Sequence, residues 1–334
     1  MPKILVTGGA GYIGSHTVLC LLQAGYDVVA YDNLSTGFAQ AVLPPAKLIT
    51  GDLADIQHVR SVLHGEDFSA IIHFAASIVV PESVTNPLKY YQNNTFNTTW
   101  LIRLATEAGI SHFIFSSTAA VYGLPDHLPV TEDAPLAPIN PYGRSKLMSE
   151  WVLQDVSKAS PAFGHVILRY FNVAGADPDG RLGQSTPDAT HLIKVACQTA
   201  LGQREHLSIF GTDYPTPDGT GVRDYIHVSD LAATHVLALH WLEQGNPSEI
   251  FNCGYGHGFS VRDIIAAVQD VSQSSLQVTN TDRRAGDPAE LVADPEKITK
   301  ALQWSPRFDD LEDIVRTAYA WEKKQMVKPW GILG

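Results

Sequence analysis

A tyrosine and a lysine four residues apart are the most reactive pair of side chains in the sequence. They lie in the segment Asn-Pro-Tyr-Gly-Arg-Ser-Lys, which ends at Lys146. Asn140 suits the cap of a helix and Pro141 its first position, so Tyr142 and Lys146 are predicted to share one helix face. A phenol titrates near pH ~10 and is a poor base at neutral pH, but a neighbouring ammonium favours the phenolate. The spacing therefore predicts a proton-transfer pair.

A threonine lies where it would assist such a pair. Residues 112–116 have the pattern of a buried strand, and Ser117 and Thr118 follow it. A proline-rich loop then leads to the helix that contains Tyr142, predicted over 141–159. A hydroxyl at the carboxyl end of a strand can polarise a substrate oxygen while a phenol exchanges its proton. Thr118 is therefore the third candidate catalytic residue.

The N-terminal segment has the order of elements that a dinucleotide site requires. An apolar strand runs directly into a turn that contains Gly8, Gly11 and Gly14, and an apolar helix follows. In that setting the glycines let the backbone approach a pyrophosphate at the helix N-terminus. The next strand ends at Asp32, about 20 residues further on, where a carboxylate bonds the adenosine ribose and repels a 2'-phosphate. The pattern predicts NAD rather than NADP.

Strands and helices alternate through the first half of the chain. Strand patterns at 47–50, 70–74, 112–116 and 165–170 are separated by helix patterns. Repeated βα units form a parallel, doubly wound sheet that binds ligands at the carboxyl ends of its strands. The predicted fold class is α/β, with a Rossmann-like sheet. Asp52 follows one strand, where it would either receive the adenine amino group or act as an ordinary turn carboxylate.

Beyond residue 172 the elements are shorter, and loops rich in Asp, Pro and Gly separate them. The expected division is a dinucleotide-binding lobe at 1–172, a smaller interleaved α/β substrate lobe at 173–334, and a return to the first lobe at 222–242. Two local predictions are made as well. One is a helix over 86–108, and the other is a strand at 223–228 followed by a helix that Ser229 or Asp230 caps.

Composition excludes several classes of protein. The chain has 334 residues and a net charge of −12, which disfavours non-specific binding to nucleic acid or anionic membranes. Its 3 cysteines are far apart, so neither a disulfide framework nor a zinc site is predicted, and the 13 histidines show no metal-ligand spacing. No stretch approaches the ~20 apolar residues of a membrane span, and no signal-peptide layout is present. We expect a cytoplasmic protein with no metal.

With these motifs in view, the chain resembles the extended short-chain dehydrogenase/reductases and, within them, the UDP-galactose 4-epimerases. The resemblance covers nearly the whole chain, and its most specific segments are Val6–His16, Phe115–Thr118, Arg169–Asn172 and Asp218–His227. It implies NAD-dependent interconversion of UDP-galactose and UDP-glucose by transient oxidation at C4, rotation of the 4-keto sugar and return of the hydride. It also implies a homodimer that packs through the helices near 90–108 and 141–159.

The resemblance further implies the residues of the site. Tyr142 would take the proton of the 4-hydroxyl, directly or through Thr118, and Lys146 would tune the phenolate. The residues implied for NAD are Gly8, Gly11, Tyr12, Ile13, Gly14, Asp32, Asn33, Asp52, Leu53, Phe74, Ala75, Ala76, Asn93, Ser116, Tyr142, Lys146 and Tyr170. Those implied for the UDP-sugar are Thr118, Tyr142, Asn172, Leu192, Ser208, Phe210, Arg223, Tyr225, Arg284, Asp287 and Leu291. Two positions depart from the family pattern: Ile78 replaces a lysine near the cofactor, and His191 replaces an asparagine near the diphosphate.

Alternative functions differ in how well the sequence suits them. Sugar-nucleotide dehydratases and UDP-glucuronate decarboxylases have acidic residues just after the threonine, where this chain has Ala119 and Ala120. A 4-epimerase for UDP-N-acetylhexosamines or for UDP-xylose and UDP-arabinose is a closer alternative. Leu291 aligns with a pocket wall where a bulky tyrosine is associated with exclusion of N-acetyl sugars, so it either admits them or is ordinary core packing. A non-catalytic NAD-binding regulator is disfavoured, because Thr118, Tyr142 and Lys146 are all present.

Overall fold

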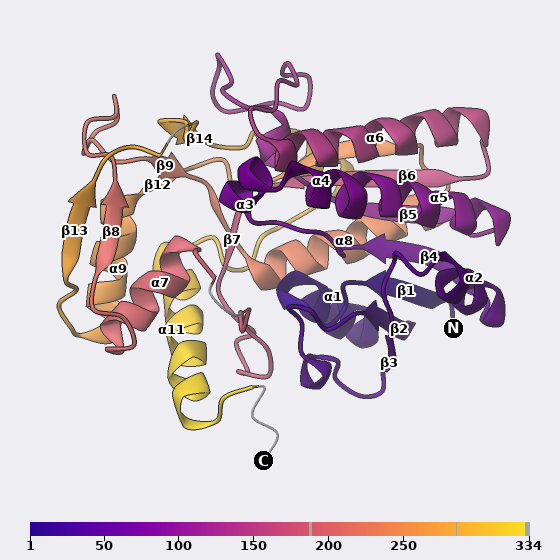
Figure 1. The fold of residues 1–334 in the computed structure, drawn as a ribbon, viewed down its shortest axis with the longest axis horizontal. Helices are drawn as coiled ribbons and strands as arrows, with labels where there is room; N and C mark the ends of the chain where they lie inside the picture. Colours follow the sequence, from indigo (N-terminus) through magenta and orange to yellow (C-terminus); the bar gives the residue numbers. More distant parts are fainter. Residues whose placement is uncertain (187–188, 285, 331–334) are drawn as a thin grey trace.

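The large lobe is built on one parallel sheet of seven strands (Figure 1). The computed structural model describes residues 1–186, 189–284 and 286–330. The strands are β1 (Lys3–Thr7), β2 (Asp27–Asp32), β3 (Lys47–Thr50), β4 (Phe68–His73), β5 (His112–Thr118), β6 (Gly164–Tyr170) and β11 (Glu249–Cys253). Their order across the sheet is β11-β6-β5-β4-β1-β2-β3, and every neighbouring pair is parallel. The predicted doubly wound sheet is confirmed.

Helices cover both faces of this sheet (Figure 1). One face carries α1 (Tyr12–Gln23) and α8 (Val228–Glu243), and the other carries α2 (Ile56–Gly65), α5 (Asn97–Glu107) and α6 (Pro141–Ala159). Alternate residues of β1 pack into the hydrophobic cores on opposite faces of the sheet. Ile4 and Val6 belong to the core of the first face, and Leu5 belongs to that of the second. Each such buried side chain contributes about 1.5–3 kcal/mol. The sheet is thus held from both sides, and its strand ends form a rigid edge.

The segment between β4 and β5 differs from the prediction. The sequence predicted one helix around 86–108, but the structure has α3 (Val80–Thr85), α4 (Pro87–Tyr90), a π-helical turn (Tyr91–Phe96) and then α5. Asn94 is buried in the π-helical turn, where its amide accepts from the Ser77 backbone N–H and donates to the Ser145 hydroxyl. Apolar periodicity does not reveal a turn that is held by polar contacts to distant residues.

The second lobe combines three packed helices with short strands (Figure 1). The helices in mutual contact are α7 (Leu192–Ala200), α9 (Val261–Ser272) and α11 (Leu311–Val327). The strands are β7 (Asn172–Ala174) beside β10 (Tyr225–His227), β8 (Leu207–Phe210) beside β13 (Val278–Thr281), and β9 (Val222–Arg223) between β12 (Phe259–Ser260) and β14 (Glu290–Leu291). Helix α10 (Glu296–Leu302) precedes α11. Within the described ranges, no helix is both long and apolar enough to cross a membrane.

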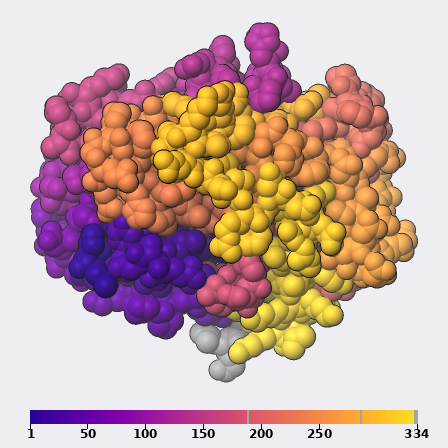
Figure 2. Space-filling view, turned by 180° about the vertical axis from the view of Figure 1, so that it is seen from behind, coloured from indigo at the N-terminus to yellow at the C-terminus, as the bar shows by residue number. Residues whose placement is uncertain are grey.

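The chain passes between the lobes more than once. After β6 it enters the second lobe, returns to the large sheet as α8 and β11, and leaves again. The returning part therefore spans 228–253 and not the expected 222–242, because β9 and β10 pair with strands of the second lobe. Seen from behind, orange segments lie directly against the indigo N-terminal residues (Figure 2), as the packing of α8 on α1 requires.

The predicted cap of α8 is wrong. His227 is the N-cap residue, and its imidazole accepts from the Ser229 backbone N–H at 3.1 Å. Asp230 is buried and accepts instead from the Tyr255 hydroxyl at 2.7 Å and from two backbone N–H groups that precede α11. The carboxylate thus links α8 to a distant segment, which local sequence does not reveal.

Candidate active site

Helix α6 begins where the sequence predicted, and its predicted cap is confirmed. The Asn140 side chain accepts from the Gly143 backbone N–H at 2.9 Å, and Pro141 is the first helical residue. Tyr142 and Lys146 follow on the face that packs against the sheet, with 8% and 2% of their surface exposed. The start of the helix therefore places a phenol and an amine together in a buried position.

The Lys146 side chain reaches the end of β5. Its amine nitrogen donates to the Ser116 carbonyl oxygen at 2.8 Å and lies 4.8 Å from the centre of the Phe115 ring. Burial lowers the pKa of Lys146 to about 7, and the Glu150 carboxylate opposes that shift. Because this pKa lies near pH 7, the protonation of Lys146 responds strongly to any charge that develops beside it.

Tyr142 meets Thr118 at the same strand end. Strand β5 extends to Thr118, two residues beyond the predicted end, and the Thr118 hydroxyl oxygen accepts from the Ala120 backbone N–H at 3.1 Å. The hydroxyl proton remains available for donation. Burial raises the pKa of the Tyr142 phenol, and the Thr118 hydroxyl partly offsets this by favouring the phenolate. The structure thus brings the three predicted catalytic side chains together.

The glycine turn after β1 forms a cradle that fits a dinucleotide. Gly8 has a φ of +72°, and a Cβ atom there would lie 2.6 Å from the Ala75 backbone nitrogen. A Cβ atom on Gly14 would lie 2.1 Å from the Gly8 carbonyl oxygen. Gly11 is the N-cap residue of α1, and no side chain caps that N-terminus. Unshared backbone N–H groups and the helix dipole suit a pyrophosphate.

Acidic side chains lie beside this cradle, at the ends of β2 and β3. The Asp32 carboxylate accepts from the backbone N–H groups of Ala10 and Leu34 at 2.9 and 2.8 Å. Burial raises the pKa of Asp32, and these two donors oppose the shift. The Asn33 amide donates to the Asp52 carboxylate at 2.8 Å. Carboxylates in these positions favour a ribose with free hydroxyls over a phosphorylated one.

The other residues predicted for the cofactor lie along the same edge, and some make structural contacts. Phe74 directly follows β4. The Tyr12 hydroxyl donates to the Gly175 carbonyl at 2.6 Å, and the Asn93 amide donates to the Ser77 hydroxyl at 3.0 Å. The remainder lie in α1, in β5 and β6, or in the turns after β3 and β4: Ile13, Leu53, Ala75, Ala76, Ser116 and Tyr170.

Part of the predicted UDP-sugar set lines one pocket. Asn172 in β7 is the register partner of Tyr225 in β10, and both line this pocket together with Leu192, the first residue of α7. His191, where the family pattern has asparagine, lines it too, and its Nδ1 lies 2.8 Å from the Gln184 amide nitrogen. Ile78, the other departure, is 49% exposed.

The rest of that set lies on the short strands of the second lobe. The Arg284 guanidinium lies 3.7 Å from the centre of the Phe210 ring at the end of β8. Arg223 in β9 lies 3.6 Å from the Asp287 carboxylate and is the register partner of Leu291 in β14. Ser208, also in β8, shares a hydrogen bond with a threonine of β13. Two arginines therefore border this part of the site.

Sequence reasoning missed two buried residues next to the catalytic segment. Glu150 lies on α6, two turns after Tyr142, and Arg169 lies on β6. Glu150 accepts a hydrogen bond from the Ser117 hydroxyl. The sequence did contain a signal for Glu150. It follows Tyr142 and Lys146 at intervals of four residues, and residues at i, i+4 and i+8 share one helix face. Arg169 stands in a segment of the family resemblance but had no predicted role.

The sheet and the pair on α6 together define the class of the protein. An acid–base pair at a strand end, opposite a glycine cradle in a parallel sheet, is the arrangement of the short-chain dehydrogenase/reductases. The chain belongs to the NAD dependent epimerase/dehydratase family, whose sequence profile matches residues 4–254.

Similar proteins extend this relationship over the whole chain. A UDP-glucose 4-epimerase of Azospirillum brasilense is 54% identical over 322 residues, which is 96% of this chain and 92% of that protein. The crystal structure of UDP-glucose 4-epimerase from Brucella ovis in complex with NAD has a TM-score of 0.93 at 43% identity, covering 96% of this chain and 98% of that one. The UDP-Glc/GlcNAc 4-epimerase from Campylobacter jejuni has a TM-score of 0.86 at 53% identity, covering 97% and 100%.

Proposed function

We propose that this chain interconverts UDP-galactose and UDP-glucose with NAD as a resident cofactor. The observation that carries the proposal is the buried pair of Tyr142 and Lys146 at the end of β5, beside Thr118 and opposite the glycine cradle. Similarity to a UDP-glucose 4-epimerase over 96% of the chain supports the substrate class. Ala119 and Ala120 provide no acid for elimination or decarboxylation.

The proton chemistry is assigned to three side chains. NAD, when bound, supplies reversible acceptance of a hydride from C4 of the sugar. Tyr142 removes the proton of the 4-hydroxyl as a phenolate, directly or through Thr118, and later returns it. Lys146 stabilises the phenolate electrostatically and would hold the nicotinamide ribose. Because the proton and the hydride both return to the sugar, there is no net oxidation.

The residues that bind the UDP moiety have a different task, which is to hold the nucleotide while the 4-keto sugar rotates. Arg223 and Arg284 would grip the diphosphate, since guanidinium groups bind phosphate oxygens in pairs. Binding energy placed on these non-reacting groups leaves the sugar free to rotate. Gly8, Gly11 and Gly14 would hold the cofactor pyrophosphate, and Asp32 the adenosine ribose.

The experiment that tests this function uses purified protein with no added NAD. It is incubated with UDP-galactose, and the nucleotide sugars are separated by chromatography. Formation of UDP-glucose is expected, and Tyr142→Phe should lower kcat by about 10²- to 10⁴-fold. A wild-type protein inactive on UDP-galactose even with NAD supplied would contradict the proposal. A regulator that only binds NAD would lose nothing in the Tyr142→Phe variant.

A second candidate function is 4-epimerisation of UDP-N-acetylhexosamines by the same site. The observation that favours it is the place of Leu291, the register partner of Arg223 in the substrate lobe. Leucine is smaller than tyrosine, so this wall leaves more space for an acetamido group. The C. jejuni relative, 53% identical, is a UDP-Glc/GlcNAc 4-epimerase. UDP-arabinose belongs in the same assay, because a pentose needs less space than a hexose.

Self-association is also part of the proposal. Phe96, at the end of the π-helical turn, and Met148 and Trp151 on α6 are 48%, 37% and 52% exposed. Apolar side chains gathered on one pair of helices favour an interface with a second copy. We propose a homodimer through the α5 and α6 face. A cytoplasmic location agrees with three free cysteines.

A further inference from the structure

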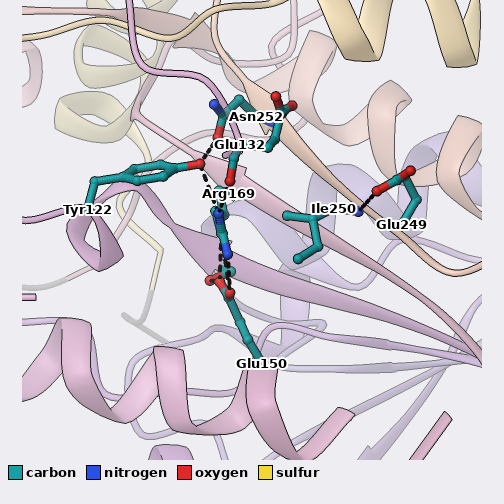
Figure 3. Close-up of polar contacts among 8 residues, drawn as sticks. Tyr122, Glu132, Glu150, Arg169, Glu249, Ile250 and Asn252 are labelled. Carbon is teal, nitrogen blue, oxygen red and sulfur yellow. Dashed lines mark hydrogen bonds and ion pairs between the residues drawn. The ribbon is translucent and has the colours of Figure 1, made fainter. Parts of the chain in front are cut away.

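A buried ion pair joins α6, the helix of the catalytic segment, to β6 (Figure 3). Arg169 of β6 and Glu150 of α6 have 1% and 0% of their surface exposed. The guanidinium donates to the carboxylate through Nη2 at 2.6 Å and through Nε at 3.1 and 3.2 Å. A planar contact of this kind fixes the angle between the two groups as well as their separation.

The other side of the arginine is fixed as well. Its Nη1 donates to the Tyr122 hydroxyl at 3.0 Å and to the Glu132 carbonyl at 3.3 Å. Tyr122 in turn donates to Asn252 of β11 at 2.6 Å. Figure 3 shows the guanidinium between the Tyr122 hydroxyl and the Glu150 carboxylate. Glu150 is therefore anchored, through Arg169, to the sheet and to the loop that covers it.

Glu150 shares a helix face with both catalytic residues of α6. Tyr142, Lys146 and Glu150 follow one another at intervals of four residues. Lys146 donates to the Ser116 carbonyl, and Glu150 accepts from the Ser117 hydroxyl. Two turns of α6 are thus tied to two consecutive residues of β5. These contacts set the rotation and the axial position of the helix against the strand.

Stability alone does not explain why this position holds an ion pair. Desolvation of two charges offsets most of their attraction, and a well-packed apolar pair of similar volume is often as stable. Apolar contacts are non-directional, whereas the guanidinium–carboxylate contact is directional. Direction matters here, because a displacement of about 1 Å at a reacting group can lower the rate by ~10²-fold.

The pair also places a carboxylate near Lys146. Two ionisable groups act on this lysine directly, His73 of β4 and Glu150 of α6. Others lie next to its contacts: Tyr142 one turn earlier on α6, His235 of α8 and Tyr170 of β6 at Ser116, and Arg169 of β6 on Glu150. Burial lowers the pKa of His73 to about 3 and that of His235 to about 4, so both are neutral at pH 7. Burial raises the pKa of Tyr170, which is neutral too. Glu150, which is ion-paired with Arg169, is therefore the group whose charge acts on Lys146.

We propose that Glu150 and Arg169 are positioning residues for the epimerisation. They hold α6 at the rotation in which Tyr142 and Lys146 meet Thr118 at the end of β5. The inference rests on the proposed function, because it needs a reaction at this site. Neither residue belongs to the sets assigned above to the cofactor or the substrate.

Two variants test the geometric part. Arg169→Lys keeps the charge but cannot bind both carboxylate oxygens in one plane. We expect its kcat for UDP-galactose to fall by about 10-fold or more, with KM within about twofold and an unchanged pH profile. The double variant Glu150→Leu/Arg169→Met removes both charges and keeps apolar packing. Its melting temperature should fall only by what the lost Ser117 and Tyr122 contacts contribute, while the kcat of the folded fraction falls as in Arg169→Lys. A double variant with wild-type kcat would overturn the proposal.

Glu150→Gln tests the electrostatic part. Loss of the carboxylate favours the Tyr142 phenolate and disfavours the Lys146 ammonium, so both limbs of the pH profile of kcat should move to lower pH by about 0.5–1 unit. A residue with a purely structural role would not move the profile of the folded enzyme. If this variant does not fold, Arg169→Lys and the double variant still decide the question.

Leu63→Ala is the matched control for lost stability. Leu63 is a buried residue near the C-terminal end of α2, which packs on the same face of the sheet as α6. The change should lower the melting temperature by leaving a cavity, yet keep kcat and the pH profile of the folded enzyme. Bound NAD is measured in every variant after denaturation. If the activity lost by the Glu150 and Arg169 variants is fully explained by their smaller folded fraction or lower NAD content, the positioning role is wrong. A wild-type protein with no UDP-galactose turnover would instead overturn the proposed function, and this inference with it.

Discussion

Tyr142 and Lys146 are each disfavoured in their charged form by burial, so neither works alone as a base or as a cation. Burial raises the pKa of the phenol and lowers that of the amine to about 7. A phenolate beside an ammonium removes much of both penalties, because each charge stabilises the other. We therefore expect the two titrations to be coupled, so that a change in one residue appears in the pH behaviour of the other.

Replacement of Lys146 should displace the pH profile as well as lower the rate. In Lys146→Met the Tyr142 phenol loses its neighbouring cation, so its pKa rises further. A base must be deprotonated, so the rate increases as pH rises through that pKa, and the acid limb should move to higher pH. We expect kcat at pH 7 to fall by about 10²-fold or more. Stopped assays of UDP-galactose conversion between pH 6 and 10 measure both effects. An acid limb at the wild-type pH would contradict the coupling.

Leu291 offers a test of specificity at a single side chain. If Leu291 borders the sugar as proposed, Leu291→Tyr narrows the space beside Arg223, and the ratio of UDP-N-acetylgalactosamine turnover to UDP-galactose turnover should fall by about 10-fold or more. Leu291→Met, which conserves volume, is the control and should keep the ratio. The measurement is kcat/KM for both sugars with each variant. An unchanged ratio in Leu291→Tyr would mean that Leu291 only packs the core.

At the scale of elements, the start of α6 controls where the catalytic face points. The Asn140 cap holds the first turn, which contains Tyr142. Asn140→Ala should lower the free energy of unfolding by about 1 kcal/mol, whereas Asn140→Asp should restore most of it. Urea unfolding with a constant m-value measures the difference. Equal midpoints for the two variants would show that the cap contributes nothing.

Local patterns predicted those elements whose causes are local. The sequence predicted α6 over 141–159 and β3 over 47–50 with the bounds that the structure has. It missed the π-helical turn, which is held by Asn94 contacts to residues distant in sequence, and the His227 cap of α8.

The candidate site divides in the same way. The glycine cradle and the Tyr/Lys pair could be predicted from residue spacing, because the residues of each lie close together in the sequence. The residues of the second lobe came from family resemblance, since no spacing joins Arg223 to Phe210 or Arg284. Glu150 and Arg169 meet only because β6 lies next to β5 beneath α6. Contacts of that kind depend on the fold as a whole and leave little trace in local composition.

At the scale of the whole molecule, the exposed apolar face of α6 predicts the state of assembly. Trp151→Glu places a charge in that face and should convert a dimer into monomers at micromolar concentration. Lys158→Glu lies on the same helix at an exposed position and is the control for added negative charge. Sedimentation velocity distinguishes the two species. A monomeric wild-type protein would contradict the proposed dimer.

The interleaved path of the chain has a consequence for its synthesis. Strand β6 is bordered on its outer side by β11, which emerges from the ribosome only after the first part of the second lobe has been made. Until then the growing chain presents β6 as an open strand edge, and an unpaired edge can join a neighbouring nascent chain. Translation that stops before residue 249 should therefore leave an incomplete, aggregation-prone sheet rather than a functional first lobe. Production of this protein is thus expected to be more sensitive to premature termination than that of a protein whose domains follow one another along the chain.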